Sequence, residues 1–240
     1  ILTEEIPASF LPDALSSFKA LMEQELSAAL ISYESIETFG TPRRMCLTGS
    51  GIASAQQELV THKTGPAKSI AYDESGNPTK AARGFARGQG IDVSELTVTV
   101  TEKGEYICAH KKEAGLPTRE LLPEMCLRVI TGIGFPKSMR WHTYDLRYAR
   151  PIHWIAALFG AQPVRFTLGG IESGNRTFGH RFMSPDPATV SDIDSYRAAM
   201  ERGGVVVDPA QRRRIIEQET ARLAQSVGGT PDRDESLLQE

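Results

Sequence analysis

The fold class is indicated most clearly by two runs, Leu96-Thr97-Val98-Thr99-Val100-Thr101 and Glu105-Tyr106-Ile107-Cys108-Ala109-His110-Lys111, which are joined by Glu102-Lys103-Gly104. Both arms are rich in β-branched and aromatic residues, which favour strands. A short connection that contains glycine between two such runs is typical of a β-hairpin. The sequence therefore predicts antiparallel strands in the middle of the chain.

More strand-like runs lie between Ser35 and Val60, where Gly40-Thr41-Pro42 and Gly49-Ser50-Gly51 predict turns. The apolar run from Ile152 to Phe159 fits a helix or a buried strand equally well. The turn that follows at Gly160-Ala161-Gln162-Pro163 favours a hairpin of two strands, because Val164, Phe166 and Leu168 then alternate with polar residues.

Helical periodicity appears on both sides of these strands. Apolar residues from Leu15 to Leu30 follow the spacing of an amphipathic helix with Asp13 as its N-cap, and Thr118 is expected to cap a second one. A short basic helix over Lys80 to Arg87 is expected to begin at Thr79. Two further helices are predicted over Ser191 to Arg202 and Pro209 to Val227.

The pattern predicts an α+β fold: mainly antiparallel short strands with covering helices, followed by a helical C-terminal segment. We expect one α+β domain over residues 1–184 and a helical segment over residues 185–240 that leads into further chain. The chain begins at Ile1 and not at Met, so its true start is expected upstream.

Composition excludes several classes of protein. The chain has 240 residues, of which 40% are hydrophobic and 24% charged, as in an ordinary globular protein. It has no run of 18 apolar residues and no secretory signal, so no membrane association is expected. Cys46, Cys108 and Cys126 lie far apart with no CxxC pair, which indicates reduced thiols in a cytoplasmic protein and gives no expectation of a metal site.

Familiar catalytic motifs are absent from the sequence. It contains no GxxxxGK[ST] phosphate loop, no HExxH and no GxSxG. We therefore expect no catalytic residue and no metal ligand in this chain, and a role beside another subunit or an RNA.

The charge distribution indicates where such a partner would bind. The formal net charge is −3, but positive charge is concentrated in residues 41–90 and 137–181. An acidic chain with basic blocks is compatible with a localised phosphate-binding surface. A solvated surface of mixed charge explains the same pattern equally well.

Four groups of cations, glycines and aromatic residues carry the functional hypothesis. They lie at residues 39–45, 77–88 and 136–142, and at 148–154 together with 176–182. On a helix, Lys80, Arg83 and Arg87 would form one cationic side next to Gly84, open to a sugar–phosphate backbone or simply to solvent. Trp141 suits base stacking or a core position, and a lone histidine is more often structural. The candidates for contact with RNA or with another subunit are Arg43, Arg44, Lys80, Arg83, Arg87, Lys137, Arg140, Trp141, Arg150, His153, Arg176, His180 and Arg181.

Six segments in the same order resemble a known family. They are Thr41-Pro42-Arg43-Arg44, Gly65-Pro66, Pro78-Thr79-Lys80-Ala81-Ala82-x-Gly84-Phe85-Ala86-Arg87, Lys137-x-Met139-Arg140-Trp141, Arg150-Pro151-Ile152-His153-Trp154 and Gly179-His180-Arg181-Phe182. Together with Thr3-Glu4-Glu5-Ile6-Pro7 they resemble the beta subunit of bacterial-type heterotetrameric glycyl-tRNA synthetase. Gly40 and Met45 stand where the family more often has alanine and leucine.

The resemblance implies a role in glycine–tRNA ligation, a step of protein biosynthesis in the cytoplasm. The family enzyme pairs two alpha with two beta subunits, and its alpha subunit activates glycine with ATP and Mg²⁺. The beta subunit is needed for charging tRNA(Gly) and carries an anticodon-binding domain beyond the length of this chain. Residues 1–184 resemble, more distantly, the editing-type domain of the phenylalanyl-tRNA synthetase beta subunit. Editing is not expected, because a tight pocket for glycine excludes larger amino acids. The alternatives are a scaffold for the alpha subunit that binds no RNA and a vestigial editing hydrolase.

Overall fold

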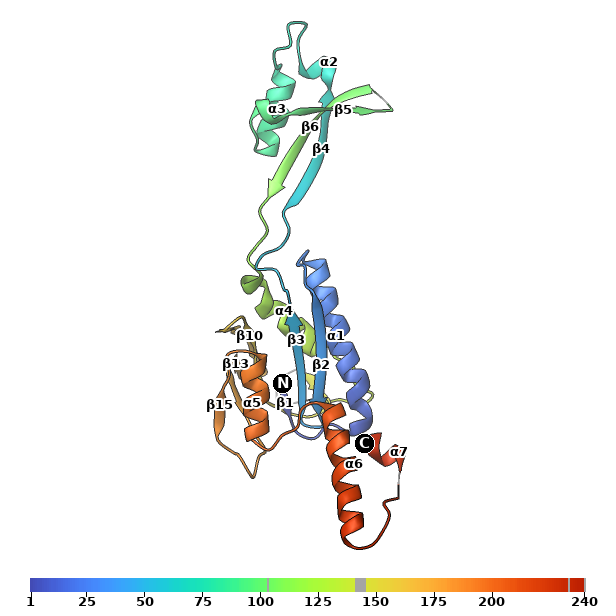
Figure 1. Cartoon of the computed structure of the whole chain (residues 1–240). Helices are drawn as coiled ribbons and strands as arrows, with labels where there is room; N and C mark the ends of the chain where they lie inside the picture. The colour runs from blue at the N-terminus through green and yellow to red at the C-terminus, as the bar shows by residue number, and fades with distance from the viewer. Residues whose placement is uncertain (103, 141–145, 233, 240) are drawn as a thin grey trace. The chain divides into compact units, whose positions relative to one another are not determined.

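The computed structural model describes residues 1–102, 104–140, 146–232 and 234–239. The chain forms two compact units (Figure 1). Unit 1 consists of Ile1–Ser54 and Pro117–Glu240, and unit 2 is the intervening segment Ala55–Leu116. The division into an α+β domain over residues 1–184 and a helical segment over residues 185–240 stays a prediction.

Unit 1 is built on a six-stranded sheet. Its strand order is β12 (Thr167–Leu168), β13 (Ile171–Gly174), β9 (Ile152–Ala156), β1 (Leu2–Thr3), β3 (Arg44–Ser50) and β2 (Ser35–Thr41). All neighbours are antiparallel except β13 and β9, which are parallel. The predicted turn at residues 40–42 is the end of the β2–β3 hairpin, where Thr41 pairs with Arg44.

The apolar run after Pro151 is strand and not helix. It forms β9 and then β10 (Leu158–Phe159), and β10 pairs with β11 (Gln162–Pro163) across the predicted turn. Val164, Phe166 and Leu168 are all buried, as their alternation predicts. The main sheet partners of β9, however, are β1 and β13, which the local sequence pattern does not indicate.

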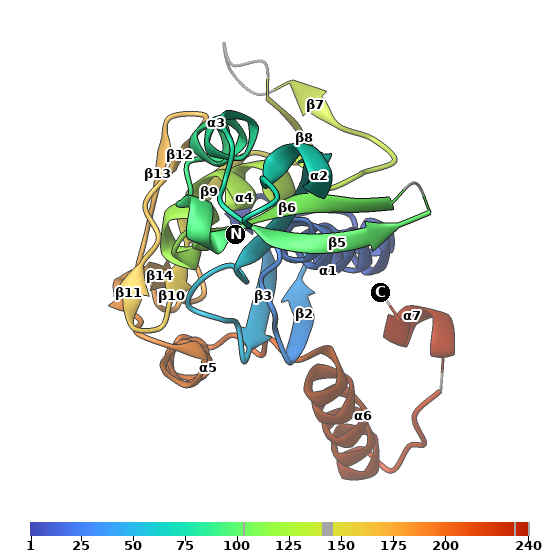
Figure 2. The same ribbon diagram turned by 90° about the horizontal axis from the view of Figure 1, so that it is seen from above.

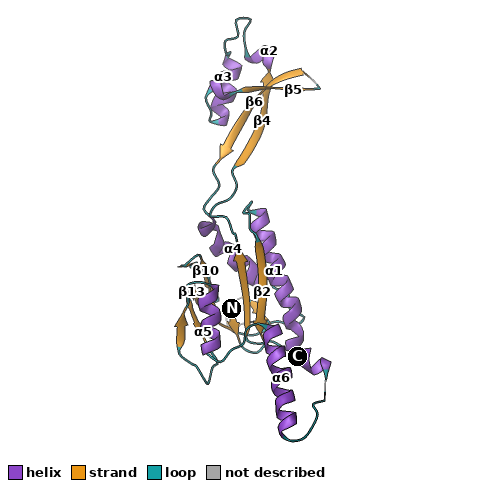
Figure 3. Ribbon diagram, in the orientation of Figure 1, coloured by secondary structure: helices purple, strands orange, loops and turns teal. Residues whose placement is uncertain are grey.

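Helices α1 (Leu11–Ala28) and α4 (Thr118–Gly132) cover one face of this sheet (Figures 2 and 3). Their buried stripes join one core with strand residues such as Ile36, Met45 and Ile152. The predicted cap at Asp13 is wrong: α1 follows the 3-10 turn η1 (Ala8–Phe10) directly, and Pro12 occupies the first turn, where a missing N–H costs nothing.

The predicted cap at Thr118 is also wrong. Pro117 occupies the N-cap position, and Thr118 is the first helical residue. Its buried hydroxyl donates to the carbonyl oxygen of Ala53 at 2.6 Å. The side chain therefore fastens the helix to the segment after β3 and leaves the helix end to backbone contacts.

Unit 2 contains the predicted central hairpin. Its sheet has the order β4 (Leu59–Ala67), β6 (Gly104–Glu113) and β5 (Thr97–Thr101), with Thr97 opposite Cys108. Helices α2 (Lys68–Ala71) and α3 (Lys80–Gln89) and the 3-10 turn η2 (Val93–Glu95) complete the unit. The core consists of small and aliphatic side chains: Ala71, Ala82, Ala86, Leu96, Ile107 and Ala109.

The remaining elements lie in unit 1. Two-stranded pairs are formed by β7 (Met139–Arg140) with β8 (Arg147–Tyr148) and by β14 (Arg176–Phe178) with β15 (Pro187–Thr189). The predicted C-terminal helices are confirmed as α5 (Ile193–Arg202) and α6 (Pro209–Ser226), followed by α7 (Glu235–Gln239). Among the described residues, no helix is both long enough and apolar enough to cross a membrane.

Candidate nucleic-acid and subunit interface

Segments far apart in the sequence meet at the N-terminal strand of unit 1. The amide of Thr3 donates to the carbonyl oxygen of Arg43 at 2.9 Å, and the amide of Glu4 donates to that of Pro151 at 3.0 Å. Because β1 lies between β3 and β9, the two motifs that contain Arg43 and His153 flank the chain at Glu4. The sheet thereby brings together candidate residues that the sequence separates by more than a hundred residues.

Glu4 is the acidic centre of this cluster. Its carboxylate accepts a hydrogen bond from His153 Nε2 at 2.8 Å and lies 3.7 Å from the Arg43 guanidinium and 3.8 Å from that of Arg181. The bond from His153 is the main reason why the pKa of Glu4 lies below its ordinary value, and Arg43 and Arg181 act in the same direction. Three sequence-predicted candidates therefore share one carboxylate.

We expect Glu4→Gln to destabilise unit 1 in a pH-dependent way. The lowered pKa means that the carboxylate stabilises the folded chain fully above the ordinary value of 4.5, and that this contribution is lost as the pH falls through the lowered folded-state value. The urea midpoint of the variant should lie below that of the parent chain at neutral pH, and the two should converge in acid. A difference that does not change with pH would contradict this assignment.

Arg44 lies inside the fold. Its Nη2 donates to the carbonyl oxygens of Phe178 at 2.7 Å and Gly179 at 2.6 Å, and only 7% of the residue is exposed. Burial lowers the pKa of the guanidinium, which still keeps two charge-assisted bonds. These two bonds connect β3 to the end of β14. The guanidinium is not accessible to phosphate because it is buried.

Other candidates near the cluster are more exposed. The Arg150 Nε donates to the carbonyl oxygen of Glu5 at 3.0 Å, and Arg181 is exposed, with its guanidinium 4.7 Å from the ring centre of Phe182. His180 Nδ1 accepts from the amides of Phe182 and Met183, both at 3.4 Å. Phe182 and Met183 are themselves 76% and 70% exposed, which makes this corner a mixed cationic and apolar surface.

Arg176, Lys137 and Arg140 also lie in unit 1. Arg176 is exposed in β14, opposite Thr189, and borders a cavity of about 820 Å³. Lys137 and Arg140 are exposed next to and within β7. Trp141 falls outside the described residues, so its predicted stacking role stays a prediction.

In unit 2, α3 has the cationic face that the sequence predicts. Thr79 caps the helix by accepting from the amide of Ala81 at 3.2 Å, and Gly90 ends it with a positive φ of 72°. Ala82 and Ala86 are buried. On the opposite side Lys80, Arg83 and Arg87 are exposed at positions that share one face of a helix. The part of the chain that the structure describes gives none of these three an ion pair.

Two glycines lie on the same exposed face of α3. A Cβ at Gly84 or Gly88 would meet no described atom within 4 Å, so internal packing does not require glycine there. By contrast, a Cβ at Gly65 in the same unit would lie 2.7 Å from the Phe85 ring. Glycine within a helix costs about 1 kcal/mol relative to alanine. The exposed backbone at Gly84 and Gly88, between the three cations, is therefore not explained by packing inside unit 2.

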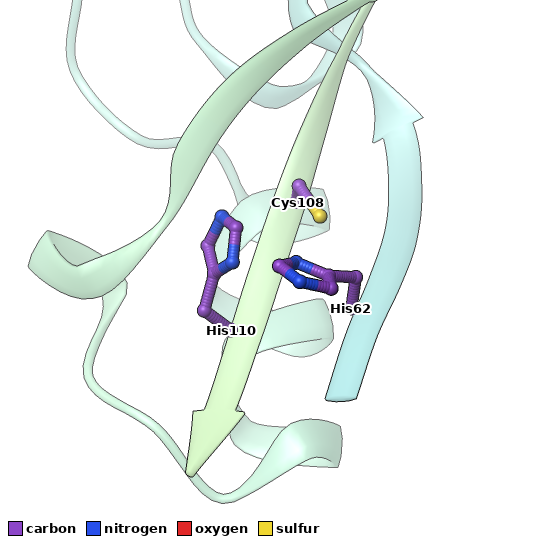
Figure 4. Close-up of side chains that lie close together, drawn as sticks. All are labelled: His62, Cys108 and His110. Atoms are coloured by element: carbon purple, nitrogen blue, oxygen red, sulfur yellow. The ribbon is translucent and has the colours of Figure 1, made fainter. Parts of the chain in front are cut away.

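Two groups of neighbouring side chains were not predicted from the sequence. Glu4 appeared only as part of a motif, and nothing in the local pattern indicates that it contacts two arginines and a histidine. The side chains of His62, Cys108 and His110 lie close together in unit 2 (Figure 4), although their spacing matches no metal-binding motif. Strand register, which the sequence alone does not give, produces both.

Comparison with known proteins places these features in a family. A family model described as "Glycyl-tRNA synthetase beta subunit" matches residues 1–240. The glycine–tRNA ligase beta subunit of Geobacter metallireducens is 50% identical over 238 residues, and that of Geobacter sp. strain M21 is 51% identical over 237. That of Syntrophotalea carbinolica is 48% identical over 238 residues. Each alignment covers 99% of this chain but only 34–35% of the relative, so the chain spans about a third of their length. The chain belongs to the glycyl-tRNA synthetase beta subunit family.

Proposed function

We propose that this chain is the amino-terminal part of a glycine–tRNA ligase beta subunit and that it binds the tRNA backbone through α3. In this proposal the alpha subunit binds ATP and Mg²⁺ and activates glycine, and two copies of each subunit assemble in the cytoplasm. The beta subunit then holds tRNA(Gly) for the transfer of glycine.

The exposed face of α3 carries the proposal. Lys80, Arg83 and Arg87 present three positive charges, and Gly84 and Gly88 remove the side chains that would keep a polymer at a distance. The negative charge of a sugar–phosphate backbone is attracted by the cations. The backbone can come close to them only where no side chains stand between. Contacts of this kind position RNA without reading its sequence.

The experiment is tRNA binding by the full alpha–beta enzyme with Arg83→Glu and Arg87→Glu. We expect tRNA affinity to fall by roughly tenfold or more. The negative slope of log affinity against log salt should become shallower by about 2, since two phosphate contacts are lost. Glycine activation, followed by ATP–pyrophosphate exchange, should keep its rate because α3 takes no part in it.

The matched control is Lys19→Glu with Arg119→Glu, which reverses two exposed cations of unit 1 and changes the net charge equally. This control should leave the salt slope at the parent value. If the two double variants change affinity and slope alike, α3 does not bind tRNA.

A second candidate function for unit 1 is docking of the alpha subunit. Phe182 and Met183 are exposed apolar side chains beside Arg181, a combination enriched in protein interfaces. Arg43, Arg150 and His153 are bonded within the chain, which suits a rigid platform. Phe182→Ser with Met183→Ser should reduce co-purification of the alpha subunit, whereas the α3 charge reversal should not. Unchanged co-purification would exclude this corner as the docking site.

A further inference from the structure

Unit 2 contains a cluster of three metal-ligating side chains on one face of its sheet. The ligand atoms of His62, Cys108 and His110 all lie within 4.8 Å of one another (Figure 4). Cys108 is 4% exposed, His110 is half-buried and His62 is exposed. The group therefore has an inner thiol and an outer imidazole, with access from solvent.

Strand register explains why these residues meet. His62 of β4 is directly opposite His110 of β6, and Cys108 precedes His110 by two residues on the same strand. Side chains two apart on a strand share a face, so all three point to the same side. Ile107 and Ala109 point to the other side, into the core of unit 2. The cluster thus lies on the sheet face opposite to that core.

Hydrogen bonds prepare one imidazole for coordination. The Thr97 hydroxyl donates to the carbonyl oxygen of Cys108 at 3.4 Å and lies 2.7 Å from His110 Nε2. Thr97 therefore occupies Nε2, and Nδ1 is the His110 nitrogen that remains for a metal ion. Metal-bound histidines commonly donate their second nitrogen to such a partner, which fixes the ring.

The spacing is close to that of a bound ion. Four ligands around zinc, with bonds of about 2.0–2.3 Å, lie roughly 3.5 Å apart. The ligand atoms of this cluster lie up to 4.8 Å apart, so side-chain rotations that move them by about 1 Å give this spacing. The His62 ring is exposed and lies edge-on to that of His110, with centroids 4.5 Å apart.

We propose that His62, Cys108 and His110 bind one zinc ion, with water as the fourth ligand. Two imidazoles and one thiolate match the preference of zinc for nitrogen and sulfur, and the exposed side leaves a position for water. Binding forms a zinc–sulfur bond in place of the Cys108 S–H bond, and the proton goes to solvent. The ion joins β4 to β6 and thereby stabilises unit 2.

The test is titration of the chain, kept reduced, with Zn²⁺ by calorimetry and with Co²⁺ by absorption. We expect one equivalent to bind, and Co²⁺ to show a thiolate charge-transfer band. His62→Gln and Cys108→Ser should each lower the affinity for Zn²⁺ by at least a hundredfold, and Cys108→Ser should remove the band. Thr97→Val should lower the affinity by about 10–100-fold, the usual effect of losing a partner to a metal-bound histidine.

His180→Gln is the control, since it removes an imidazole from unit 1 and should leave binding unchanged. Circular dichroism of each variant without metal checks folding, and His62 is suited to this test because it is exposed. The absence of stoichiometric binding would overturn the proposal. Equal affinity in the parent chain, His62→Gln and Cys108→Ser would also overturn it, because it would indicate an adventitious ion only.

Discussion

Replacement of Gly179 by alanine is expected to lower the free energy of unfolding of unit 1 by about 2–3 kcal/mol. A Cβ at this position would lie 2.7 Å from the Cα of Gly203 and 2.9 Å from its carbonyl oxygen. Both are backbone atoms at the end of α5, so no side-chain rotation relieves the clash. The two backbones also share a hydrogen bond from the amide of His180 to the carbonyl oxygen of Gly203 at 2.7 Å.

Urea unfolding followed by tryptophan fluorescence measures this effect in unit 1, because residues 55–116 contain no tryptophan. Gly134→Ala is the matched control, since a Cβ there would meet no described atom within 4 Å and its backbone has no positive φ. The control should keep the parent midpoint or exceed it. If Gly179→Ala unfolds at the same urea concentration as Gly134→Ala, the close crossing of the two backbones is not a constraint.

Arg44→Met is expected to destabilise unit 1 by about 2–3 kcal/mol. Methionine preserves much of the buried stem but cannot donate to the carbonyl oxygens of Phe178 and Gly179. Two bonds from a charged donor are lost, each worth about 1.5–3 kcal/mol, and part of the loss is offset because a guanidinium no longer has to be buried. Arg43→Met, at the half-buried neighbouring residue, should cost less. Equal midpoints for the two variants in urea would contradict the internal role of Arg44.

The two substitutions should not be additive. Arg44 donates to the carbonyl group of Gly179, so displacement of that backbone by a new methyl group already weakens the bond. In a double-mutant cycle, Arg44→Met should therefore cost less when Gly179→Ala is present than in the parent chain. Additive losses would show that the arginine and the glycine act independently, and that the motifs around them are not coupled.

Local features of the fold followed from the sequence. The β5–β6 hairpin and the cationic face of α3 were both predicted, because each depends only on residues close together in the chain. The helices over Ile193–Arg202 and Pro209–Ser226 were predicted within two residues. The caps at Asp13 and Thr118 were wrong because both residues lie inside the helices, which begin at Leu11 and at Thr118 itself.

Long-range pairing did not follow from the sequence. The two-residue strand β1 is too short to show any periodicity, yet it lies between β3 and β9 and creates the Glu4 cluster. The His62–Cys108–His110 group depends on the register of β4 against β6, which is set by contacts that span the unit. Arg44 and Arg43 are adjacent in sequence, but only the structure separates the buried guanidinium from its more exposed neighbour.

Binding of tRNA against the exposed backbone of α3 can be measured by crosslinking. A photo-crosslinking amino acid is placed at position 84 of the beta subunit, in the assembled alpha–beta enzyme. We expect a covalent adduct with tRNA(Gly) that excess unlabelled tRNA suppresses, and no such adduct from the same group at position 19 of α1. Crosslinking from position 84 to protein alone, or equal tRNA adducts from both positions, would contradict it.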